Sequence, residues 1–515
     1  MKRLSQRLLT GCVLAFALTG GYWGMCLTPL NRWAMYFSRL DFWVLLALTL
    51  AGGSLLGAGA YAAERLFPRA KPLLVASFWP WLALALANNF PALRLRLVSR
   101  TGWTWLTGTV WWLVVWGLGA LGMALALVSP RWKNGAARGW FFLRRVCWPA
   151  VFVIPLAVWR LPFLDAARGQ GLDFSLGSGN GTPATVVLMF DMLGYEELFD
   201  EAGQVRTAYT NFARFCETSD VFHAAESAGE ETATSLPGFI VQERLASPPR
   251  KLVRAFGDWL FQDGTETLRA QQFAAQSLPA RARDRGGRAQ AIGMYIPWDA
   301  ILPGVWSATE SMAFAYGNQG VHDFGQVPSF RTAAKGHFAW YFLVTSKSPL
   351  SAAFKLSGMD ERTKAQGYGE RRSLVSRAGR LLRESLSPGD FVFVHVDLPH
   401  CPYVIGRDGE RLPPSLQDDE VLGFAAQTAA ADWALGVWLE AIASSPAGRE
   451  AWVVVTSDHN RQNPVYRKGP VTHVPFLVHR PGQTQRRDVA EPADLTDLAH
   501  VVPDLPLFAA GERAE

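Results

Sequence analysis

The pattern of apolar and polar positions divides the chain into two parts near residue 165. The first part contains five apolar stretches, each close to the ~20 residues that a bilayer-spanning helix needs. These stretches lie at 7–28, 41–63, 72–90, 103–128 and 145–162. They predict an N-terminal domain of about five transmembrane helices over residues 1–165.

The second part alternates short β-type apolar runs with helical periodicity over residues 184–481. Strands are expected at 184–190, 289–297, 390–396, 451–456 and 474–479, and helices near 194–216, 229–245, 371–386 and 418–445. This alternation predicts an α/β domain in which helices cover both faces of a mostly parallel sheet. Residues 166–183 are expected to form a flexible linker and 482–515 a peripheral tail, while 246–350 show no organising pattern.

The charges follow the same division. Residues 1–160 carry 17 Lys and Arg against two acids, whereas the remainder carries 33 basic and 42 acidic residues. The overall net charge of +6 is therefore not a nucleic-acid-binding signature. Alternate loops between the apolar stretches carry 11 and five basic residues, so the positive-inside rule places the N-terminus in the cytoplasm. Five spans would then deliver the C-terminal domain to the opposite side of the membrane.

Side chains suited to metal binding follow two of the predicted strands. The run 184–190 ends at Asp191, and the run 453–457 ends at Asp458 and His459. The carboxyl ends of strands in an open α/β sheet are where ligands bind. Two further segments carry reactive side chains, namely Thr232 within 229–237 and His400 within Pro-His-Cys-Pro-Tyr.

Each of these residues alone has an ordinary structural interpretation. Asp191 and Thr232 could cap helices, Asp458 and His459 could lie in a surface turn, and His400 could belong to a loop ordered by prolines. Their joint order along the chain favours a functional interpretation.

That order is Phe-Asp, Thr-x-x-Ser-Leu-Pro, His-x-Pro-Tyr, Thr-Ser-Asp-His and His-Val-Pro-Phe-Leu-Val, and it resembles the alkaline phosphatase/sulfatase superfamily. With the apolar stretches ahead of it, the chain is similar to the membrane-anchored envelope branch, which contains phosphoethanolamine transferases and lipoteichoic acid synthase-type phosphoglycerol transferases. The resemblance implies that Asp191, Thr232, Asp458 and His459 hold one divalent metal, Zn²⁺ or Mn²⁺.

The resemblance also implies roles in catalysis. Thr232 would be the nucleophile that forms a phosphothreonine, and His400 would act as a catalytic acid or phosphate contact. His473 is either a metal or phosphate ligand or a structural residue. Lys468 and Arg461 are either substrate contacts or members of a solvated basic loop.

Three departures qualify the resemblance. The nucleophile segment lacks the Cys/Ser-x-Pro-x-Arg context of sulfatases, which disfavours sulfate-ester hydrolysis. Phosphoethanolamine transferases place Glu where this chain has Asp191, and they carry many more cysteines than Cys216 and Cys401, the two in this domain. Asn460 replaces the usual Gly after Asp-His, and because asparagine tolerates a left-handed backbone better than most residues, the turn can survive.

The leading hypothesis is a phosphotransferase of the bacterial inner membrane with its catalytic domain on the periplasmic side. It would move a phospholipid-derived phosphoethanolamine or phosphoglycerol headgroup to an envelope glycan or lipid. One alternative is a metal-dependent phosphodiesterase or phosphatase, a sulfatase-like hydrolase that uses water as acceptor. The other is a catalytically degenerate envelope scaffold, for which Asn460 is the main argument.

Overall fold

The structure is a computed structural model. It describes residues 2–27, 39–80, 82–83, 109–147, 172–177, 179, 181–244, 261–263, 266–268, 274–294, 296, 298, 302, 304–312 and 359–508.

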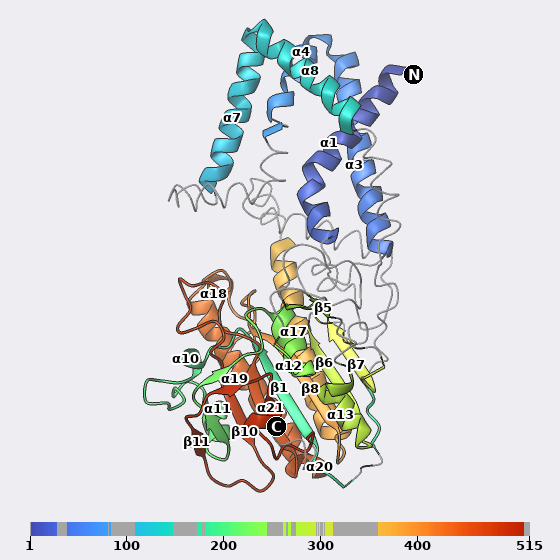
Figure 1. The fold of residues 1–515 in the computed structure, drawn as a ribbon. Helices are drawn as coiled ribbons and strands as arrows, with labels where there is room; N and C mark the ends of the chain where they lie inside the picture. The colour runs from blue at the N-terminus through green and yellow to red at the C-terminus, as the bar shows by residue number, and fades with distance from the viewer. Residues whose placement is uncertain are drawn as a thin grey trace.

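An eight-stranded sheet in the order β11-β2-β10-β9-β1-β8-β6-β7 forms the centre of the C-terminal part (Figure 1). Its strands are β1 (Thr185–Asp191), β2 (Asp220–Phe222), β6 (Ala289–Met294), β7 (Ala308–Met312), β8 (Phe391–Pro399), β9 (Trp452–Ser457), β10 (Phe476–His479) and β11 (Arg487–Val489). Every pairing in it is parallel except those that β10 makes with β2 and β9. The predicted mostly parallel sheet is therefore confirmed.

The three central strands are buried along their whole length on both faces. Runs such as Val453-Val454-Val455 suit this position, because a strand covered on both faces lacks the polar alternation of a half-exposed strand. Two short pairs lie outside the large sheet, β3 (Ala225–Glu226) with β12 (Ala493–Asp494), and β4 (Phe261–Asp263) with β5 (Glu266–Leu268).

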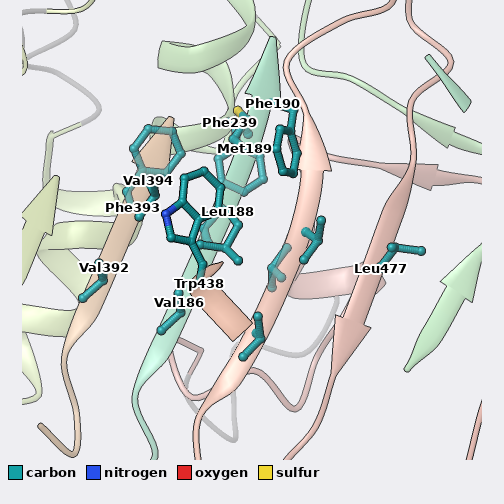
Figure 2. Close-up of a cluster of buried hydrophobic side chains, with 14 of the residues drawn as sticks. Val186, Leu188, Met189, Phe190, Phe239, Val392, Phe393, Val394, Trp438 and Leu477 are labelled. Atoms are coloured by element: carbon teal, nitrogen blue, oxygen red, sulfur yellow. The ribbon is translucent and has the colours of Figure 1, made fainter. Parts of the chain in front are cut away.

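Helices cover opposite faces of this sheet. Trp438 of α19 (Leu422–Ser444) packs 5.8 Å from the ring of Phe190 on β1. Phe239 of α12 (Thr232–Val241) stacks at 6.3 Å on Phe393 of β8, which pairs with Val187 and so faces the other way from Phe190. Figure 2 shows these aromatic rings among the strand valines and leucines. The core therefore consists of large apolar side chains on both faces of β1 and β8.

The remaining helices of this part are short, apart from one. They are α10 (Tyr195–Leu198), α11 (Thr210–Cys216), α13 (Leu278–Asp284), α18 (Pro414–Gln417), α20 (Pro446–Arg449) and α21 (Leu498–Val501), and the long one is α17 (Met359–Glu384). The single helix expected near 194–216 is wrong, because two short helices flank an irregular segment there.

The N-terminal part consists of helices α1 (Lys2–Leu27), α3 (Arg39–Leu66), α4 (Lys71–Ala76), α7 (Thr109–Val128) and α8 (Pro130–Cys147), with a 3₁₀ turn η1 (Pro68–Ala70). Among the described residues, Phe42–Leu66 is long and apolar enough to cross a membrane by its length and composition, with mean hydropathy 1.7. Shorter apolar helices lie at Leu4–Phe16 and Gly117–Val128. A bundle of five transmembrane helices is therefore not established by the described residues.

Three of the five expected spans coincide with helices, namely the first with α1, the second with α3 and the fourth with α7. The third is described only as far as residue 83, and most of the fifth lies outside the described residues. The basic segment between the fourth and fifth spans, expected to be a loop, is helix α8.

Helices α1 and α3 pack through glycines. A Cβ on Gly11 would lie 1.9 Å from the carbonyl oxygen of Gly53, and one on Gly57 would lie 2.3 Å from that of Arg7. Gly53 and Gly57 form a Gly-x-x-x-Gly pattern, which lets two helix backbones approach closely. The side chain of Arg7 also forms an ion pair with Glu64 across this contact.

Both segments that flank the α/β domain contribute to it. In the expected linker, the backbone N–H of Asp173 donates to the side chain of Gln290. In the expected peripheral tail, β11 adds a strand to the sheet and Leu498, Val502 and Leu505 are fully buried. The boundary at residue 481 was therefore wrong, because the periodic apolar positions after it complete the core.

Candidate metal and nucleophile site

The carboxyl ends of three neighbouring strands, β9, β1 and β8, meet at one edge of the sheet. Asp191 is the last residue of β1, and Asp458 directly follows β9. His395 lies on β8 beside Met189, two positions before Asp191. Side chains alternate between faces along a strand, and this register places all three on the face that α12 covers. Each is fully or almost fully buried, and their ligand-type atoms lie within 4.8 Å of one another.

A network of backbone amides fixes the two strand ends to each other. The N–H of Asp458 donates to the carbonyl oxygen of Phe190 at 2.9 Å, and that of Met192 donates to Asp458 Oδ1 at 3.1 Å. Met192 has a left-handed backbone with φ of 67°, which is uncommon for a side chain of this kind. The chain therefore turns sharply just after Asp191, and this conformation is held by contacts to the neighbouring strand.

His459 has a defined orientation within this edge. Its Nδ1 lies 2.7 Å from the carbonyl oxygen of Asn460, which can only accept a hydrogen bond, so Nδ1 carries the proton. When the ring is neutral, the lone pair is on Nε2, which lies 3.8 Å from Asp191 Oδ1 and 3.5 Å from Asp458 Oδ2. Its lone pair is available to a cation or to a hydroxyl donor.

Thr232 completes the cluster from the first turn of α12. Its Oγ1 lies 3.2 Å from Nε2 of His459, to which it donates a hydrogen bond. Thr232 does not cap the helix, because Glu231 occupies the N-cap position and no side-chain cap bond forms there. The helix start instead orients Thr232 toward the strand ends, and the positive end of the helix dipole lies beside it.

The two neighbouring hydroxyls are engaged elsewhere. Thr234 Oγ1 donates to the carbonyl oxygen of Glu231 at 3.0 Å, and Ser235 Oγ donates to that of Asp458. Both side chains are buried. Ser235 thus fastens α12 to the end of β9, and Thr232 presents the hydroxyl of this helix turn that faces His459.

The electrostatics of the cluster favour a bound cation. Both carboxylate oxygens of Asp191 and Oδ2 of Asp458 are buried and accept no hydrogen bond within the described structure. Burial, followed by the neighbouring Asp458 carboxylate, raises the pKa of Asp191 well above its ordinary value. Two buried like charges are costly unless a cation neutralises them. Carboxylate oxygens with one imidazole and a hydroxyl are donors that Zn²⁺ and Mn²⁺ accept, so these residues fit a divalent metal.

His395 is a member of the site that the sequence did not indicate. A histidine inside an apolar strand has the local pattern of a packing residue, and His395 is buried. It also lies against Asp191 and Asp458 as a third ligand-type side chain. Burial lowers its pKa to about 4, so the ring is neutral and can act as a metal ligand. The signal available in the sequence was a histidine five positions before His400 on a strand that ends at the same edge.

His400 follows β8 and is acted on by the same charges. Burial alone would lower its pKa, but the Asp191 carboxylate and the Cys401 neighbourhood raise it well above the ordinary value. The Nδ1 atom of His400 lies 2.6 Å from the carbonyl oxygen of Cys401. The side-chain amide of Gln427 donates a hydrogen bond to the carbonyl oxygen of His400. His400 is therefore fixed in orientation, and the Asp191 carboxylate shifts its pKa toward the charged form.

Arg371 of α17 supports this segment. It forms a buried ion pair with Asp397 of β8, and it also lies within 3.5 Å of the carbonyl oxygen of His400. Arg371 thus connects helix α17 to the backbone at His400, the candidate catalytic acid.

The three weaker candidates lie outside the cluster. His473 uses both ring nitrogens, Nδ1 toward Glu196 Oε1 at 2.7 Å and Nε2 toward the carbonyl oxygen of His223 at 3.0 Å. Arg461 is buried, with its guanidinium 3.9 Å from the ring centroid of Phe424. Lys468 is exposed and pairs with Glu197. The geometry of His473 and Arg461 favours structural roles, and Lys468 retains access to solvent.

Asn460 does not use the left-handed backbone that asparagine tolerates. Its amide donates to the carbonyl oxygens of Lys468 at 2.7 Å and Pro470 at 3.1 Å, and its Oδ1 accepts from the N–H of Arg461. The positive φ lies across the edge, at Met192. Asn460 therefore holds the loop after His459 through its side chain, a role that glycine could not fill. Cys216 and Cys401 are both free thiols.

The sequence matches no protein-family model and no curated protein. Among solved structures, a lipoteichoic acid synthase from Listeria monocytogenes is similar at 14% identity and TM-score 0.38, over 66% of this chain and 75% of that one. A 2-O GAG sulfatase is similar at 14% identity and TM-score 0.38, covering 65% and 72%. A phosphonate monoester hydrolase of Agrobacterium radiobacter is similar at 14% identity and TM-score 0.37, covering 62% and 73%. Because these similarities are low, function is inferred from the strand order and the site residues of this chain.

Proposed function

We propose that this protein is a membrane-bound, metal-dependent phosphotransferase that acts through a phosphothreonine on Thr232. The observation that carries the proposal is the convergence of a half-buried hydroxyl, an oriented imidazole and two buried carboxylates at one sheet edge. A structural role explains buried ion pairs well, but it does not explain buried carboxylate oxygens that accept no hydrogen bond.

Asp191, Asp458, His459 and Thr232 would hold the metal, with His395 beside them. When bound, a divalent cation lowers the pKa of a hydroxyl and neutralises charge on a phosphoryl group. The donor set accommodates Zn²⁺ and Mn²⁺ alike. A titration with each metal alone, read by the unfolding temperature, would distinguish them.

The residues of the chain supply orientation and proton transfer. The start of α12 places Thr232 Oγ1 at the strand ends, and once its proton has passed to solvent, the oxygen would attack the phosphorus of a phosphodiester. The bond from phosphorus to Thr232 forms as the bond to the leaving oxygen breaks. The His400 imidazolium would give its proton to that oxygen. In a second step an acceptor hydroxyl would displace Thr232 and release the transferred group.

The proposed donor is a phospholipid carrying a phosphoethanolamine or phosphoglycerol headgroup, and the proposed acceptor is an envelope glycan or lipid. The apolar helix Phe42–Leu66 and the basic N-terminal part support a position at the bacterial inner membrane. The charge asymmetry of the loops supports a catalytic domain on the periplasmic side. Proximity to the bilayer would make a phospholipid donor abundant at the site.

The test uses full-length protein, each phospholipid donor separately, and intact-mass analysis. Wild type should acquire one phospho-headgroup on Thr232, and its mass identifies the headgroup. Thr232→Ala should lose the adduct and at least ~10³-fold of turnover, because it removes the nucleophile. Thr232→Ser should retain the adduct on the new hydroxyl.

Thr207→Ala, at an exposed threonine that is not part of the site, serves as the matched control and should behave as wild type. An adduct that persists in Thr232→Ala would contradict the mechanism. Release of the headgroup at the same rate with and without an added acceptor glycan or lipid would contradict the proposed transferase. That result would support a hydrolase that uses water as acceptor.

A further inference from the structure

Helix α8 presents an exposed basic face. Arg131, Arg138 and Arg145 lie seven residues apart, so they occupy nearly the same side of an α-helix, and all three are exposed. Phe141 and Phe142 are also exposed, at 51% and 62%, and the guanidinium of Arg145 lies 4.6 Å from the ring centroid of Phe141. Cations and aromatic rings are thus interleaved on one face.

The opposite face of α8 is occupied. Trp140 donates its indole N–H to the carbonyl oxygen of Val75 at 3.2 Å, and Trp132 packs 5.0 Å from Trp79. A Cβ on Gly139 would lie 2.2 Å from the ring of Phe78, so the helix is seated closely against the segment that follows α4. These contacts fix the rotation of α8 and leave the arginine face outward. In Figure 1, α8 runs from the end of α7 across the group toward α1.

The N-terminal part contains few acids that could pair with this face. Residues 1–160 contain only two acids, Asp41 and Glu64, and Glu64 is paired with Arg7. No ion pair involving Arg131, Arg138 or Arg145 occurs among the described residues of α8 and its neighbours. Three exposed guanidinium groups beside exposed phenylalanines match the headgroup and acyl boundary of an anionic leaflet.

We propose that α8 lies in the membrane interface and binds anionic phospholipids through the face formed by Arg131, Arg138, Arg145, Phe141 and Phe142. Arginine stems and aromatic rings would enter the boundary of the acyl chains, while the guanidinium groups contact lipid phosphates. This inference rests on the proposed membrane location and is independent of the chemistry at Thr232. It assigns the basic segment between α7 and the C-terminal part a lipid partner in addition to a topological role.

The test begins with alkaline carbonate extraction of membranes that contain the full chain. Recovery of wild type in the soluble fraction would overturn the membrane location and this inference together. If the protein stays in the membrane, native mass spectrometry of the purified chain with equimolar phosphatidylglycerol and phosphatidylcholine tests α8 alone.

Wild type should retain phosphatidylglycerol preferentially, and the preference should fall on raising the salt concentration. The triple variant R131Q/R138Q/R145Q should lose on the order of 100-fold of it, since each basic residue contributes about fivefold near an anionic surface. Replacing the same three by lysine should preserve most of the preference. R372Q/R383Q/R449Q, three exposed arginines of the C-terminal part, should leave it unchanged.

Equal lipid preference in wild type and R131Q/R138Q/R145Q would overturn the proposal. So would unchanged lipid preference combined with loss of a co-purifying protein or of self-association, because the face would then belong to that partner.

Discussion

The two parts of this molecule bring their elements together by opposite means. In the N-terminal part, α1 and α3 approach through Gly11, Gly53 and Gly57, while Leu55 and Leu66 of α3 remain 74% and 72% exposed. In the C-terminal part, aromatic rings and branched side chains fill both faces of a sheet. Small residues at the helix–helix contact and large apolar residues on the outer surface suit helices that are surrounded by lipid. Lipid tails are as apolar as leucine, so burying leucine between the helices gives no hydrophobic gain. Aqueous folding requires the reverse arrangement.

Each part also contains an arginine–carboxylate pair that joins two elements. The Arg7–Glu64 pair is partly exposed, whereas the Arg371–Asp397 pair is almost completely buried. Buried pairs depend much more strongly on both partners being present, because a remaining charge has no water to solvate it. Losing one partner of the Arg7–Glu64 pair should therefore have only a local effect in the N-terminal part. Losing one partner of the Arg371–Asp397 pair should also disturb the candidate site.

The largest effect is expected at the cluster of carboxylates. Asp191→Asn should lower turnover by at least ~10³-fold, because it removes a ligand-type oxygen and half of the charge that favours a cation. In metal-free protein the same variant should raise the unfolding temperature, since it removes the repulsion between Asp191 and Asp458. Thermal unfolding with chelator and with added metal checks both signs. An equal metal-induced shift in wild type and variant would exclude Asp191 as a ligand.

Breaking the buried pair should have the next largest effect. Arg371→Met should lower the free energy of unfolding by about 3–5 kcal/mol, because Asp397 is left buried without its partner. Adding Asp397→Leu should recover most of the loss. Arg372→Met, at an exposed position on the same helix, is the control. Urea unfolding measures all four proteins, and equal stability of Arg371→Met and Arg372→Met would refute the comparison.

A smaller and local effect is expected at the glycine contact. Gly53→Leu should separate α1 from α3 at a cost of about 1–3 kcal/mol, since a Cβ there would lie 2.5 Å from Cα of Cys12. Gly52→Leu is the matched control, because a Cβ at Gly52 meets nothing within 4 Å. The readout is oxidative crosslinking of Cys12 to a cysteine placed at Ser54, whose atoms are 3.7 Å apart in the structure. Unfolding of the C-terminal domain should not change, and its destabilisation would show that the two parts are coupled.

The smallest effect concerns His473. Its hydrogen bond to Glu196 raises the pKa against the opposing effect of burial, from an ordinary value of 6.5. This stabilisation is fully present below pH 6.5 and is lost as the pH rises through the raised value. The free energy of unfolding should fall by about 1 kcal/mol or less over that interval, and His473→Gln should abolish the slope. A slope that survives in the variant would assign the titration to another group.

Strand patterns foretold much of the C-terminal fold. The five expected strands all exist, because strands buried on both faces need continuous apolar runs that stand out in a sequence. The break between α10 and α11 and the contribution of β11 depend on long-range packing, which leaves a weak local signal. Segment 246–350 remains largely outside the described residues, although β6 and β7 within it complete one edge of the sheet.

The site was anticipated in part. Asp191, Thr232, Asp458 and His459 were singled out from their order in the chain, and the structure brings the four together. His395 was not predicted as a site residue, because a histidine inside an apolar strand has the same local pattern whether it packs or binds. The sequence indicated only the backbone preference of Asn460. In the structure its side-chain amide holds the following loop through three hydrogen bonds.

By itself the sequence determined the division into a basic apolar part and an α/β part, since both follow from the period and sign of side chains along the chain. It also determined which residue types end the central strands. Only the tertiary structure decided which hydroxyl faces His459, which histidines join the carboxylates, and which face of α8 stays exposed. Those outcomes depend on strand register, helix rotation and hydrogen bonds between segments more than 200 residues apart.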